Sequence, residues 1–217
     1  MMAEPASPQQ TLYRHAFVHN CFVLIVMARE GLTGSFIATE EPTITGLLVK
    51  RAKEITEQVD APLWIEHLVI MDDPPQNDQE HRLGKRRPRI DFEFELVVRG
   101  RRPRFHIEAK RLYRNDSATE YWGAEGLGMF LEGAYASSWP SAGMIGYIQT
   151  DDSPHWRQTL EAKHRNSKVG SCKHQPSLLP VDWCTEGLSE VRISCHKRTS
   201  ADLGQIEIYH LLLDFCK

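Results

Sequence analysis

The sequence RIDFEFELVV, residues 89–98, alternates between apolar and polar side chains and is followed, after a basic stretch, by RFHIEAK, residues 104–110. A period of two residues is typical of β-strands, because successive side chains point to opposite faces. In both segments one face is apolar, formed by Ile90, Phe92, Phe94, Leu96 and Val98 and by Phe105, Ile107 and Ala109. The other face is polar, formed by Asp91, Glu93 and Glu95 and by His106, Glu108 and Lys110. The two segments predict an antiparallel pair of strands.

The register of this pair decides which polar residues meet. A tight turn centred on residues 100–101 places residue 91 opposite residue 110 and Asp91 diagonal to Glu108 on the same face. A slip of one residue would send the two acidic sets to opposite faces. We therefore expect Asp91, Glu108 and Lys110 to share one face.

These three residues have the chemistry of a phosphodiester hydrolase. Mg²⁺ prefers oxygen ligands, keeps several waters, polarises a phosphoryl group and lowers the pKa of bound water. Asp91 and Glu108 are the expected ligands, with the backbone carbonyl of Ala109 as a third, and Mn²⁺ may replace Mg²⁺ in the same role. Lys110 can orient or activate the attacking water. The alternative interpretation is a solvated strand face with an ordinary surface ion pair between Glu108 and Lys110.

Basic residues border this segment, although the net charge of the 217-residue chain is −3. Nine lie between positions 82 and 104: Arg82, Lys85, Arg86, Arg87, Arg89, Arg99, Arg101, Arg102 and Arg104. Beside a phosphodiester site such a cluster favours the binding of a polyanion, whereas elsewhere it is usually a solvated charge run. The predicted nucleic-acid contacts are Arg87, Arg89, Arg102, Arg104 and Arg111.

The other elements predict an α/β fold in one domain, residues 1–217, with a mixed sheet flanked by helices. Helical spacing covers residues 11–30, 41–59, 121–135 and 152–164, and strand-like patterns cover residues 63–71, 142–149, 191–197 and 205–215. Residues 74–88 read as an exposed loop. In the predicted helix 121–135, Tyr121, Glu125 and Glu132 form a polar stripe. The core spans about residues 41–150, preceded by the N-terminal helix and followed by a C-terminal strand pair at 190–216.

In this order of elements and in its D…E-x-K residues, the chain resembles the PD-(D/E)xK nuclease superfamily, whose restriction-endonuclease-like core is αβββαβ. The resemblance implies a Mg²⁺-dependent DNA endonuclease of the kind found in bacterial restriction or anti-phage defence. It also implies an auxiliary acidic residue at Glu41 and supporting polar residues at Tyr121 and Glu125. His106 and His196 are further candidates beside the site. Ile90 departs from the family pattern, which has proline before the aspartate.

The resemblance leaves two other hypotheses open. The chain can be a catalytically silent module of the same fold that binds nucleic acid or a protein partner, or a scaffold whose carboxylates are incidental. The expected partners are nucleic acid, with DNA favoured over RNA, and a second copy or a protein of a defence system.

The five cysteines, Cys21, Cys172, Cys184, Cys195 and Cys216, are irregularly spaced. Without a C-x₂-C pair they favour free thiols over a structural zinc site. The N-terminus has neither the basic nor the apolar part of a signal peptide, and the longest apolar segment, residues 17–28, is too short to span a bilayer. We therefore expect a cytoplasmic protein without a membrane segment.

Overall fold

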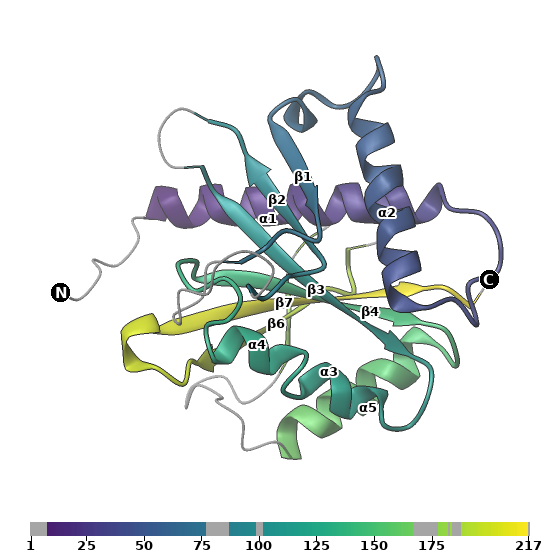
Figure 1. Cartoon of the computed structure of the whole chain (residues 1–217), viewed down its shortest axis with the longest axis vertical. Coiled ribbons are helices and arrows are strands. Elements are labelled where there is room, and N and C mark those ends of the chain that lie inside the picture. The colour runs from purple at the N-terminus through teal and green to yellow at the C-terminus, as the bar shows by residue number, and fades with distance from the viewer. Residues whose placement is uncertain are drawn as a thin grey trace.

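Seven strands form one mixed sheet in the order β1-β2-β3-β4-β7-β6-β5 in the computed structural model (Figure 1). It describes residues 8–76, 87–98, 102–166, 178–181, 183 and 188–216. The strands are β1 (Leu68–Asp72), β2 (Phe92–Leu96), β3 (Arg104–Leu112), β4 (Ser141–Ile148), β5 (Leu179–Pro180), β6 (Arg192–Lys197) and β7 (Gln205–Asp214). β4 runs parallel to β3 and β7, while the other neighbouring pairs are antiparallel. The α/β class with a mixed sheet is therefore confirmed.

Helices cover both faces of the sheet. They are α1 (Pro8–Glu30), α2 (Glu41–Thr56), α3 (Ser117–Trp122), α4 (Leu127–Leu131) and α5 (Ser153–Asn166), with short 3₁₀ turns at Leu63–Ile65 and Ala201–Leu203. Two apolar cores result, one under α1 and α2 and the other under α3, α4 and α5. Each of the predicted helices 11–30, 41–59 and 152–164 is confirmed to within a few residues.

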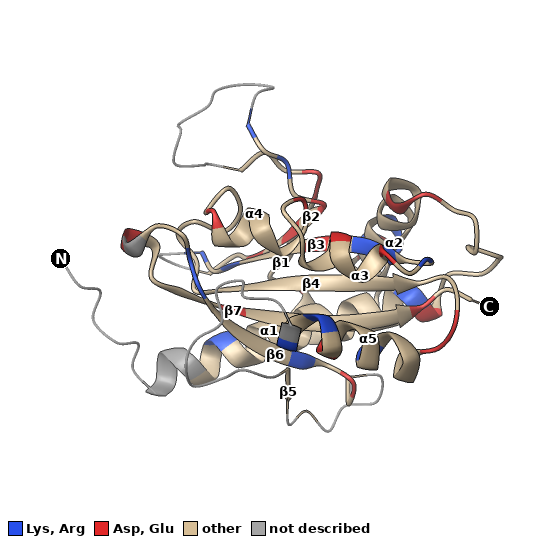
Figure 2. Cartoon of the chain, turned by 90° about the horizontal axis from the view of Figure 1, so that it is seen from below, with Lys and Arg blue, Asp and Glu red and all other residues tan. Residues whose placement is uncertain are grey.

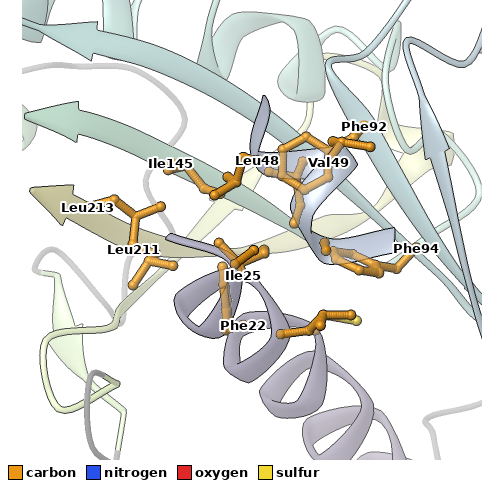
Figure 3. Close-up of a cluster of buried hydrophobic side chains, with 14 of the residues drawn as sticks. Phe22, Ile25, Leu48, Val49, Phe92, Phe94, Ile145, Leu211 and Leu213 are labelled. Carbon is orange, nitrogen blue, oxygen red and sulfur yellow. The ribbon is translucent and has the colours of Figure 1, made fainter. Parts of the chain in front are cut away.

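The first core shows why the sequence folds in this way. α1 contributes Phe22 and Ile25 and α2 contributes Leu48, all at helical spacing, and they meet the apolar side chains of the sheet (Figure 3). Phe92 and Phe94, the alternating apolar residues of β2, point into this core and are at most 1% exposed. Burying an aromatic side chain of this kind contributes about 2 to 3 kcal/mol. This face of the hairpin is therefore fixed by the hydrophobic effect.

The predicted hairpin forms, but in a register shifted by two residues. Phe92 pairs with Ile107, which brings Asp91 opposite Glu108 instead of Lys110. β2 ends earlier than predicted, because the Leu96 N–H still donates to Pro103 O at 2.9 Å but the Val97 N–H turns away to His67 O at 2.7 Å. The connection therefore spans residues 97–103. A shift of two preserves the faces, so the polar residues still lie together.

Two other predicted elements are wrong in their extent. The helix expected at 121–135 is divided into α3 and α4, because the chain turns between Gly123 and Gly126. At both glycines a backbone carbonyl lies so close that a Cβ atom would not fit. The strand expected at 63–71 begins only at Leu68, since Pro62 starts a 3₁₀ turn closed by the Ile65 N–H to Pro62 O bond of 2.9 Å.

The C-terminal strand pair is confirmed as β6 and β7, and β7 enters the middle of the sheet between β4 and β6. A further short strand, β5, lies outside the predicted strands. In the described ranges, no helix has both the length and the apolar character needed to cross a membrane.

Candidate functional site

Asp91, Glu108, Lys110 and Glu41 come together from three elements. Asp91 directly precedes β2, Glu108 and Lys110 lie on β3, and Glu41 is the first residue of α2. Figure 1 shows this end of α2 beside the end of β3, and Figure 2 shows acidic and basic residues meeting there. The structure thus brings together the four residues predicted to be catalytic.

The side chain of Asp91 is hydrogen-bonded to β3 just beyond the point where β2 and β3 stop pairing. Its Oδ2 accepts a hydrogen bond of 2.6 Å from the backbone N–H of Ala109. In a strand, the N–H and C=O of one residue point to the same edge, so the Ala109 carbonyl also faces the start of β2. The carbonyl predicted as a third metal ligand is therefore on the edge of β3 that faces Asp91.

Lys110 joins the carboxylates of two different elements. Its Nζ lies 2.6 Å from Glu108 Oε1 and 3.2 Å from Glu41 Oε1. Glu41 Oε2 also accepts a hydrogen bond of 3.0 Å from the backbone N–H of Arg111. These contacts fix the start of α2 against the end of β3.

Burial perturbs the acids of this cluster. It raises the pKa of Glu108 to about 8, with the charge of Asp91 adding to the effect and Lys110 opposing it. It also raises the pKa of Asp91 to about 6, against the Ala109 N–H and the charge of Lys110, which lower it. For Lys110, burial acts to lower the pKa, but the charges of Glu108 and Glu41 outweigh it, so the pKa is raised. The cluster therefore sets three carboxyl groups, those of Asp91, Glu108 and Glu41, against one ammonium.

These pKa values predict how stability depends on pH without metal. An acid whose pKa is raised by folding costs stability once it ionises, so the free energy of unfolding should fall as the pH rises from 6.5 to about 8. Thermal unfolding in EDTA should show this fall, and Glu108→Gln should flatten it. A wild-type midpoint that rises over this window would contradict the assignment. Burial also holds the pKa of His210 well below its ordinary value of 6.5. Below pH 6.5 this histidine therefore lowers the free energy of unfolding as the pH falls.

The donor set fits Mg²⁺ by its chemistry. In the described residues, no three His, Cys, Asp or Glu side chains are close enough together to hold a metal ion by themselves. Mg²⁺ does not require such a cage, because it binds through one or two carboxylates and retains waters. The half-buried Asp91 and the buried Glu108 supply hard oxygen ligands on the side of β3 that the Ala109 carbonyl faces.

Tyr135 lies beside the site and was not identified from the sequence. Its hydroxyl donates to Arg89 O at 2.6 Å, and its pKa is raised by burial and by the charges of Glu108 and Asp91. It was expected as the last residue of a helix over residues 121–135, but it lies in the turn after α4. The alternation of the hairpin carries no signal for it, because the turn is placed by tertiary packing.

The predicted arginines are divided between two places. Arg102 and Arg104 lie at the far end of the hairpin, where they form ion pairs with Glu95 at 3.0 and 2.8 Å. Along β3, Arg104 is about 20 Å from Lys110. Arg89 is closer to Asp91 but is paired with Asp73 at 2.6 Å, and Arg87 is half-buried just before it. Arg82, Lys85, Arg86, Arg99 and Arg101 lie outside the described residues.

Arg111 is the predicted arginine that does lie at the site. Its backbone binds Glu41, and its guanidinium lies 2.8 Å from Glu40 and 4.4 Å from the ring centre of Tyr113. Of the five predicted nucleic-acid contacts, it is therefore the one placed directly beside Lys110.

The acidic face of β2 is buried beyond Asp91, where the alternative interpretation expected a solvated surface. Glu93 is 1% exposed and Glu95 is 7% exposed. Glu93 lies 3.0 Å from His106 Nε2 and 3.2 Å from Arg104. His106 is therefore a partner of Glu93 in a buried ion cluster, two positions along the hairpin from Asp91 and Glu108.

Tyr121 and His196 are placed away from the site. Tyr121 is fully buried, with its hydroxyl 3.0 Å from His210 Nδ1 and 3.3 Å from Met144 O. Ser194 Oγ lies 2.7 Å from His210 Nε2 and 2.6 Å from His196 Nε2. The polar stripe expected to start at Tyr121 is therefore wrong: this residue is part of a buried network that packs α3 on the sheet. Among the cysteines, Cys21 is a buried free thiol, while Cys172 and Cys184 lie outside the described residues.

A pocket of about 710 Å³ opens beside Lys110, between the start of α2, the end of β3 and α3. Glu41, Arg111 and the exposed Glu125 also line it. Glu125 is thus near Lys110 across the pocket, in the turn after α3 and not on a helix.

Comparisons of the chain with protein-family models, with curated proteins and with solved structures gave no match.

Proposed function

We propose that this protein is a Mg²⁺-dependent phosphodiester hydrolase that cuts nucleic acid, with DNA as the expected substrate. One observation carries the proposal: Asp91, Glu108 and Lys110 are held on one face, with Glu41 closing the cluster from α2. The charge excess and the raised carboxyl pKa values support a site that receives a cation. The Ala109 N–H bond orients Asp91 before any substrate arrives.

The residues have separate roles in this mechanism. Asp91, Glu108 and the Ala109 carbonyl would hold the metal, which supplies charge neutralisation and an acidified water. The Lys110 ammonium orients the attacking water and stabilises the charge that develops on the phosphoryl oxygens. Glu41 is a positioning residue, because it reaches Lys110 and the Arg111 backbone.

The order of elements supports the resemblance to restriction-endonuclease-like nucleases. α2, β1, β2, β3, the α3–α4 segment and β4 follow one another as in an αβββαβ core. Ile90 is the residue before Asp91 and stands where that family has proline. It is fully buried in the second core, and this burial holds the backbone just before Asp91 in place. An apolar anchor can thus hold the chain where a proline would otherwise stiffen it.

A metal-dependence panel tests the proposal. Wild-type protein should cut linear, circular or single-stranded DNA, or RNA, in Mg²⁺ or Mn²⁺ and not in EDTA. Lys110→Ala should abolish cutting while the circular dichroism spectrum stays unchanged. Mg²⁺ should also raise the thermal midpoint of the wild type, because a ligand that binds only the folded state stabilises it. Mg²⁺-induced stabilisation without cutting on any substrate would favour the catalytically silent module instead.

A further inference from the structure

The pocket beside Lys110 contains a row of cationic and aromatic side chains that the hydrolysis of a phosphodiester does not require. Lys110, Arg111, Tyr113 and Arg114 all line it as the chain leaves β3. The guanidinium carbons of Arg111 and Arg114 lie 4.4 and 5.0 Å from the centre of the Tyr113 ring. Cation–π contacts of this kind hold guanidinium groups in place. The row therefore begins at the candidate catalytic lysine and leads away from it through the pocket.

The present partners of these arginines can be replaced by phosphate. Arg111 pairs with Glu40, whose side chain is 71% exposed, and Arg114 pairs with Asp116, whose side chain is 61% exposed. Arg114 also contacts Glu120. Exposed ion pairs contribute little stability, whereas a phosphate offers guanidinium a bidentate, charge-assisted contact. In the pocket, Glu41 is already bound by Lys110 and by the Arg111 N–H, so it does not compete for the guanidinium groups.

The size of the pocket decides which form of nucleic acid fits. A volume of about 710 Å³ is that of a site for one small ligand. A base in an intact duplex is stacked and paired, and it can enter such a pocket only after it is unpaired and unstacked. A nucleotide of a single strand enters without this cost, and sites for single strands combine basic tracks with aromatic groups.

We infer that this pocket binds a nucleotide of a single-stranded segment next to the phosphodiester at Asp91, Glu108 and Lys110, with Arg111 and Arg114 on its phosphates. This inference rests on the proposed function, because the phosphodiester is assigned to the adjacent cluster of Asp91, Glu108 and Lys110. It restricts the substrate to nucleic acid with a single-stranded part, such as a single strand, a frayed end or a flap. Both DNA and RNA fit this description.

Fluorescence anisotropy in EDTA tests the inference without any cutting. The probes are a labelled oligodeoxythymidine, an oligouridine of the same length and a blunt DNA duplex of that length. At least one single-stranded probe should bind the wild type about 10-fold more tightly than the duplex, and the comparison of the two single strands identifies the preferred sugar. Arg114→Gln should weaken single-strand binding several-fold and reduce the slope of log K against log salt by about 0.7. The matched control, Arg165→Gln, removes an exposed arginine of α5 and should change neither value.

Two results separate the inference from the proposed function. Equal affinity for duplex and single strand, or an Arg114→Gln variant that behaves like Arg165→Gln, overturns the inference even where metal-dependent cutting is found. Single-strand binding that depends on Arg114, with no cutting in Mg²⁺ or Mn²⁺, supports the inference and rejects the hydrolase.

Discussion

Replacing Asp91 with asparagine should lower metal-dependent cutting by a factor on the order of 10³ without lowering the stability of the protein. Asparagine keeps an oxygen that can accept the Ala109 N–H bond, so the geometry is retained while the charge is lost. Because burial raises the pKa of Asp91 to about 6, the ionised carboxylate costs folding free energy at pH 7.5. The Asp91→Asn protein should therefore unfold at the same denaturant concentration as the wild type, or at a higher one.

Glu54→Gln is the matched control for this experiment. It also removes one negative charge, but from an exposed pair with Arg51 on α2. Initial rates of cutting and urea unfolding curves should be measured for the wild type and both variants. Glu54→Gln should leave both unchanged. Undiminished cutting by Asp91→Asn would reject the assignment of the site, and a large loss of stability would show that Asp91 is a structural residue.

The largest expected effect on stability is that of Gly126→Ala, which should cost about 3 kcal/mol of unfolding free energy. A Cβ atom at Gly126 would lie 2.4 Å from Tyr121 O and 2.7 Å from Glu120 O. Both atoms belong to the backbone of α3, so the helix itself has to move. Since α3 forms one wall of the pocket and carries Tyr121 into the buried histidine network, the displacement should reach both.

Gly46→Ala provides a control with the opposite sign. Gly46 lies inside α2, and a Cβ atom there would meet nothing within 4 Å. Alanine in a helix interior is more favourable than glycine by about 1 kcal/mol, so this variant should be more stable than the wild type. Urea unfolding monitored by circular dichroism measures both changes. A Gly126→Ala protein as stable as the wild type would show that the turn between α3 and α4 can relax.

The hairpin could be predicted from the sequence because burial of Phe92 and Phe94 imposes a strict period of two. The same periodicity determined the shared face of Asp91, Glu108 and Lys110, even though the register was wrong by two residues. The exact pairing depends on Pro103 and on the bond from Val97 to His67, a residue that precedes β1. A hydrogen bond between residues 30 positions apart does not affect the alternation of apolar and polar residues, so it cannot be predicted from that alternation.

Tyr121 and Tyr135 illustrate the complementary limit. Both fit a helical spacing, and a helix through residues 121–135 was the simplest interpretation of that spacing. The break at Gly123 and Gly126 instead sends Tyr121 toward His210 and Tyr135 toward Arg89, on strands and loops distant in sequence. Side-chain periodicity cannot distinguish a long helix from two short ones when glycines allow both.

The position of β7 has a consequence for the synthesis of the protein. This strand contains residues 205–214, yet it lies between β4 and β6 in the middle of the sheet. While the ribosome is still making this segment, β4 pairs on one edge with β3, which carries Glu108 and Lys110, and its other edge is open. Pairings between segments so distant in sequence form late in folding. A nascent chain is therefore expected to complete the sheet around Glu108 and Lys110 only after residues 205–214 have been made.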